Sequence, residues 1–121
     1  MKKLLIIGLL SITSLVNAEA IVQKNKYVKE YQKINDNMHS EMNIGYTGDP
    51  DIDFVLSMIP HHKGALEMAK LQLKYGLSPQ LKKLAEEIII AQEKEISYME
   101  EYLKSKGVNS YLNDSTHEGH H

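Results

Sequence analysis

The 121-residue chain contains no cysteine, no tryptophan and no arginine. Without cysteine it forms no disulfide, has no cysteine for lipid attachment and offers no thiolate to a metal ion. Without arginine, and with 14 lysines interspersed among 16 acidic residues, it lacks the basic patch of a nucleic-acid-binding protein. The sequence also has no phosphate-binding loop and no recognisable signature that sets a nucleophile beside a histidine. We therefore expect no nucleic-acid partner.

The amino terminus has the pattern of a secretory signal peptide. Lys2 and Lys3 precede an apolar run over residues 4–16, which is well short of the roughly 20 residues that a membrane-spanning helix needs. The run is followed by small residues, so we expect cleavage after Ala18, with Ala20 as the second choice. This pattern predicts a periplasmic or secreted mature protein.

Removal of residues 1–18 leaves 103 residues, which carry 12 lysines against 16 acidic residues. That length suits one domain with a modest core. We expect this domain to occupy residues 19–107. Residues 108–121 are polar and without periodicity, so they are predicted to form a flexible, disordered tail.

The domain is predicted to be all-α, a small antiparallel bundle of three helices. Apolar residues at spacings of three and four predict the first helix between residues 22 and 43. The second should start at Asp49 or Asp51 as the amino-terminal cap and stop at Gly76, with a bend at Pro60. Ser78 and a following proline start the third, which ends at Gly107. The apolar positions of the first helix are Tyr27, Tyr31, Ile34, Met38 and Met42.

The string Met58-Ile59-Pro60-His61-His62, followed by Met68, places two imidazoles and two thioethers on the second helix. Thioether sulfur favours Cu(I), and imidazole accepts several transition metals. The pattern therefore indicates a copper site. The alternative is that the methionines fill the core as flexible apolar side chains, while one histidine packs and the other is exposed.

The helical period brings further candidate ligands to this string. His62 should point toward the core, beside Met58, and His61 toward its rim. A tight hairpin between the second and third helices would pair residues whose numbers sum to about 154, placing Gln92 opposite His62. Glu95 is expected near Met58, either as a ligand or as an acceptor for a histidine N–H. The candidate metal ligands are Met38, His39, Met42, Met58, His61, His62, Met68 and Met99, supported by Gln92 and Glu95.

Residues 51–103 resemble a bacterial domain-of-unknown-function family with a Met-x-x-His-His signature. The resemblance is carried by Asp53-Phe54-Val55, by the Met58–His62 string, and by Gln92, Glu95, Met99 and Leu103. It implies ferritin-like packing of helices. For some members, such as the periplasmic protein CopM, it also implies copper or silver binding linked to copper tolerance. The chain departs from the family at Tyr102, where many members carry tryptophan.

The predicted tail carries three histidines outside that pattern, His117, His120 and His121. Imidazoles on a flexible segment can collect Cu(II), Zn²⁺ or Ni²⁺ weakly. They are therefore a candidate secondary site, and an incidental polar end is the alternative.

Three functions compete. The leading one is a non-enzymatic periplasmic copper protein, a buffer or carrier of Cu(I), with Cu(II) or Ag(I) as further ions and an envelope copper-export or copper-transfer protein as partner. The second is a ferritin-like di-metal oxidase, which needs Glu-x-x-His motifs inside the bundle; the chain has this motif only at Glu118–His121. The third is an interaction module that forms a homodimer, with the histidine pair structural.

Overall fold

The computed structural model describes residues 3–43 and 45–109, with side chains from residue 12 onward. These residues form three α-helices and no strand: α1 (Lys3–Met42), α2 (Pro50–Tyr75) and α3 (Pro79–Ser105). This confirms the predicted all-α helical bundle. In the described part of the chain, no helix is both long enough and apolar enough to cross a membrane.

Helix α1 is longer than the sequence pattern predicted. It starts at Lys3 rather than near residue 22 because the leader is rich in leucine and other residues compatible with a helix. The chain divides into two compact units, residues 1–33 and 34–121, and α1 extends from the first into the second. In the second unit, Ile34, Met38 and Met42 are half-buried, which matches the predicted spacing.

Helix α2 begins at a side-chain cap. The Asp49 carboxylate accepts hydrogen bonds from the backbone N–H of Asp51 at 2.9 Å and of Ile52 at 3.2 Å, so Asp49 rather than Asp51 is the cap. The helix ends at Tyr75, as predicted. Gly76 follows with φ −68°, so this end does not depend on the left-handed conformation that glycine permits.

Asp53 joins the preceding loop to the first turn of α2 through hydrogen bonds. Its carboxylate accepts hydrogen bonds from the backbone N–H of Thr47 at 2.7 Å, from the Thr47 hydroxyl at 2.8 Å and from the N–H of Gly48 at 3.1 Å. The Thr47 amide, and then its hydroxyl, lower the pKa of Asp53 because they stabilise the charged carboxylate. Gly48 has φ +88°, a conformation that favours glycine.

Helix α3 has defined signals at both ends. The Ser78 hydroxyl accepts from the Leu81 N–H at 3.3 Å. At the other end Gly107 is left-handed, with φ +75°, and the Val108 N–H donates to the Leu103 carbonyl at 3.0 Å, which completes a Schellman motif. Val108 also packs against the core, so ordered structure continues past the predicted boundary at residue 107. The remainder of the predicted tail, residues 110–121, lies outside the described residues.

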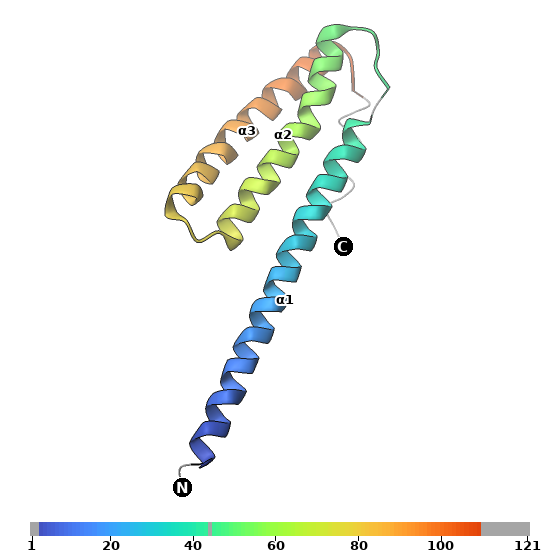
Figure 1. Ribbon diagram of the computed structural model, residues 1–121. Coiled ribbons are helices and arrows are strands. Elements are labelled where there is room, and N and C mark those ends of the chain that lie inside the picture. Colours follow the sequence, from blue (N-terminus) through green and yellow to red (C-terminus); the bar gives the residue numbers. More distant parts are fainter. Residues whose placement is uncertain (1–2, 44, 110–121) are drawn as a thin grey trace. The chain divides into compact units, whose positions relative to one another are not determined.

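The core lies between α2 and α3, which run side by side and antiparallel (Figure 1). It is concentrated at the end of the hairpin far from the turn at residues 76–78. On α3, the apolar side chains near the turn are buried only in part, since Leu81 and Leu84 are about half exposed. The core cluster consists of Ile52, Val55, Leu56, Ile59, Met99 and Leu103.

Candidate metal centre

An open groove of about 850 Å³ runs between α2 and α3. Met58 and His62 line it from α2, and Glu95 and Met99 line it from α3. The sequence predicted this meeting of thioether, imidazole and carboxylate groups, and the structure confirms it. The other lining residues are Asp51, Phe54, Val55, Ala91, Lys94, Tyr98 and Tyr102.

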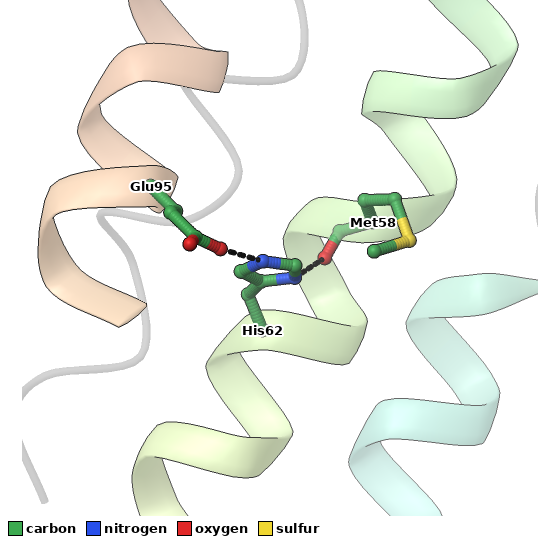
Figure 2. A network of polar contacts seen from close by, with 3 residues as sticks. All are labelled: Met58, His62 and Glu95. Atoms are coloured by element: carbon green, nitrogen blue, oxygen red, sulfur yellow. Dashed lines mark hydrogen bonds and ion pairs between the residues drawn. The ribbon is translucent and has the colours of Figure 1, made fainter. Parts of the chain in front are cut away.

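His62 is held at both ring nitrogens (Figure 2). Nδ1 lies 2.9 Å from the backbone oxygen of Met58, and Nε2 lies 2.6 Å from Oε2 of Glu95. The His62 side chain is 11% exposed and that of Glu95 is 59% exposed. A carbonyl and a carboxylate both accept hydrogen bonds, so the arrangement needs a proton at each ring nitrogen, or one supplied by the Glu95 carboxyl.

The contact between His62 and Glu95 corrects the predicted register. The expected partner of His62 was Gln92, but the observed pair has residue numbers that sum to 157 rather than 154. Side chains on a helix lean toward its amino terminus. His62 therefore leans away from the hairpin turn while Glu95 leans back toward it, and they meet across an offset of three residues. The prediction that Glu95 accepts a histidine N–H agrees with this geometry.

Gln92 has no partner to replace the one predicted. Its Oε1 is buried, and no hydrogen-bond donor reaches that atom within the described residues. Gln92 does not line the groove. Its role as a supporting residue for a metal ligand stays a prediction.

Met58 and Met99 contact both the core and the groove. Met99 is buried in the core cluster, and Met58 packs against that cluster. In Figure 2 the sulfur of Met58 lies on the far side of its own carbonyl from the His62 ring. A metal ion held by both would require rotation of the Met58 side chain, which its three flexible bonds allow.

The remaining candidate ligands do not line this groove. His61 is exposed, as expected for the rim, with its ring centroid 6.5 Å from that of His62. Met38 lies against Gly64, because a Cβ on Gly64 would come within 2.6 Å of its sulfur. His39 is exposed, with Nδ1 2.7 Å from its own helix at the Asn35 carbonyl. The single convergent set expected from the sequence is thus divided between different faces of α2.

The described residues contain no group of three or more histidine, cysteine, aspartate or glutamate side chains placed to hold a metal ion. His117, His120 and His121 lie outside the described residues.

The sequence reasoning missed the aromatic walls of the groove. Tyr98 follows Glu95 by three residues and Tyr102 follows by seven, so a helical period places all three on one face of α3. This spacing from Glu95 was the sequence signal that could have identified the two tyrosines. Tyr98 is 72% exposed and Phe54, across the groove, is 62% exposed.

Residues 51–121 match the family described as Domain of unknown function (DUF305). The chain belongs to this DUF305 family. Over 56 residues it is also 38% identical to "Uncharacterized protein L153" of Acanthamoeba polyphaga mimivirus, a match that covers 46% of this chain and 37% of that protein. The chain thus aligns with little more than a third of that relative's length.

The DUF305 match contains every residue that lines the groove. It confirms the predicted membership of a domain-of-unknown-function family. Met38, His39 and Met42 precede the matched range.

Proposed function

We propose that the protein is a non-enzymatic periplasmic binding protein that holds Cu(I), with Ag(I) as an alternative ion, in the groove between α2 and α3. The observation that supports this is the position of the His62 imidazole, held by Glu95 in a groove that Met58 and Met99 also line. A mixed thioether and imidazole shell suits a soft cation, and it does not suit Mg²⁺ or Ca²⁺.

The hydrogen bonds of His62 suggest which nitrogen would bind the metal. Nδ1 faces the backbone of Met58, whereas Nε2 bonds to Glu95. Metal binding at Nδ1 would leave the Nε2–H bond to the carboxylate intact, and that arrangement is the usual one for an imidazole ligand. The metal would take the place of the Nδ1 proton, while Glu95 keeps the ring oriented.

The resemblance to the Met-x-x-His-His family, whose members include CopM, supports the same proposal. In that role the chain would act as a buffer or carrier in copper tolerance and would pass its ion to an envelope copper-export or copper-transfer protein. Thioethers are not blocked by protons near neutral pH, so binding and release would depend mainly on competition between ligands.

One observation favours an interaction module as a second candidate. Phe54 and Tyr98 expose large apolar surfaces beside the groove, and Leu77 is 93% exposed at the hairpin turn. A homodimer that buries these side chains would make the histidine pair structural. A ferritin-like oxidase has less support, because α2 and α3 contain no Glu-x-x-His motif.

Anaerobic Cu(I) titration of the mature protein, read by intact mass, tests the copper proposal. Met58→Leu roughly conserves volume, so stability should change by less than about 1.5 kcal/mol. Cu(I) affinity should fall by at least about tenfold, the loss that follows removal of even an outer-shell partner. His62→Ala should give a loss at least as large.

Ile59→Leu is the matched control, since it alters the packing of the same core cluster and removes no donor atom. It should bind Cu(I) like the parent. If Met58→Leu and His62→Ala also bind like the parent, the groove is a packing feature, and sedimentation analysis should then show the dimer of the interaction-module alternative.

A further inference from the structure

The side of α2 away from His62 carries a second set of soft donors. His61, Gly64 and Met68 are three and four residues apart, so they lie along one face of the helix. Gly64 is two residues beyond His62, which rotates it by about 200° around the axis. This set is therefore well separated from the groove that His62 lines.

Met38 of α1 lies on this face. Its sulfur would be 2.6 Å from a Cβ built on Gly64, so the thioether occupies the space that a side chain at that position would fill. Gly64 stands one turn after His61 and one turn before Met68. The sulfur of Met38 thus lies against the residue that separates His61 from Met68 along the helix.

Met42 is one turn beyond Met38 on α1, and both are half-buried. Met68 is half-buried and His61 is exposed. Within the described part of the chain, neither ring nitrogen of His61 is hydrogen bonded, whereas both nitrogens of His62 are. We call these four residues, Met38, His61, Gly64 and Met68, the Gly64 face.

We propose that the Gly64 face is a second soft-metal site, in which the thioethers of Met38 and Met68 and the imidazole of His61 bind one Cu(I) or Ag(I). The inference rests on the proposed function, since it assigns the same class of ion to a different face. It divides the adjacent histidines between two sites, His62 to the groove and His61 to the Gly64 face. The mature protein then binds two soft cations rather than one.

Ag(I) titration of mature protein labelled with ¹³C at the methionine methyl groups tests this directly. Of the six methionines, all but Met1 follow the predicted cleavage point, so each candidate sulfur has its own signal. The Met38 and Met68 methyls should shift with one equivalent of Ag(I), and the Met58 and Met99 methyls with another. A structural role for these methionines would produce no such shift.

Variants show which site binds each equivalent of Ag(I). Met38→Leu/Met68→Leu should lose one of two Ag(I) equivalents, with affinity at that site reduced by at least about tenfold, and should keep the shift of Met58. Met58→Leu is the matched control, because it removes one sulfur from the other face and should leave the Met38 and Met68 shifts unchanged.

Gly64→Ala tests the site without removing a donor. Alanine is the better helix former, and the added Cβ displaces the flexible end of Met38, so the fold should persist. Ag(I) affinity at the Gly64 face should fall while the groove is unaffected. Unchanged affinity at this face in Gly64→Ala would contradict the placement.

The inference is overturned if the Met38 and Met68 methyl signals do not shift during addition of two equivalents of Ag(I). It is also overturned if all four methyls move together with a single equivalent, since that indicates one shared site. Failure of the proposed function gives a different result: the Met58 and Met99 methyl signals then do not shift with Ag(I), whether or not the signals of the Gly64 face do.

Discussion

Gln92 is the residue whose surroundings fit its chemistry least. A buried amide oxygen without a donor costs roughly 1 to 3 kcal/mol relative to one that is hydrogen bonded. The sequence predicted that Gln92 lies opposite His62. That partner was wrong, because the lean of side chains on antiparallel helices moves the contact of His62 to Glu95.

Gln92→Leu should stabilise the metal-free protein by about 1 kcal/mol, because it removes the unpaired oxygen and adds apolar contact. For a domain of this size, the melting temperature should rise by about 4 to 8 °C, measured by circular dichroism. Gln92→Glu is the converse variant and should lower the melting temperature, since the new carboxylate buries a charge. A lower melting temperature for Gln92→Leu would mean that the amide has a stabilising partner.

At the scale of elements, the ends of α2 and α3 were predictable because each is set by local chemistry. Asp49, Ser78 and Gly107 act through hydrogen bonds within a few residues of themselves, so their positions can be read from the sequence. The start of α1 was not predicted, because the leader is apolar and was interpreted as a signal segment rather than as a helix. The contact of Met38 with Gly64 was also not predictable, because loop length alone does not fix the level at which two helices meet.

The loop between α1 and α2 should be sensitive to acid through Asp53. The hydrogen bonds from Thr47 lower the pKa of Asp53 in the folded state below its ordinary value of 3.8. A group with a depressed folded pKa stabilises the fold above its unfolded pKa and loses that contribution as pH falls through the folded value. Urea midpoints should therefore decline below about pH 4.

Asp53→Asn isolates this contribution. The variant should be less stable than the parent at neutral pH and should show a shallower decline between about pH 4 and pH 2. Asp51→Asn is the control from the same first turn, and it should decline as steeply as the parent. An Asp53→Asn protein with the parent's acid slope would show that other carboxylates dominate the response.

At the scale of the whole molecule, we predict export with cleavage after Ala18, because the apolar run is too short for an anchor and ends in small residues. Mass spectrometry of periplasmic material should find a chain that begins at Glu19. Recovery of the full-length chain from the membrane fraction would reverse this prediction and would remove the access to periplasmic copper that the proposed function needs.

The fold class and membership of a domain-of-unknown-function family were predictable from the sequence, whereas the division of candidate ligands between two faces of α2 was not. Helical periodicity indicates which residues of one helix share a direction. It does not show which neighbouring helix covers that direction, and this determines what surrounds His61 and His62. The contacts of Met38 and Glu95 with α2 supply that information.

The bond between His62 and Glu95 joins residues 33 apart in sequence while the groove beside it stays open. The fold by itself therefore already holds the imidazole in place, and the proposed capture of an ion would require no refolding. Met58 would have to rotate its half-buried side chain, but no helix would have to form before the ion binds. A carrier of the kind proposed could therefore exchange its ion without unfolding, in contrast to small zinc domains, whose folding depends on the bound metal.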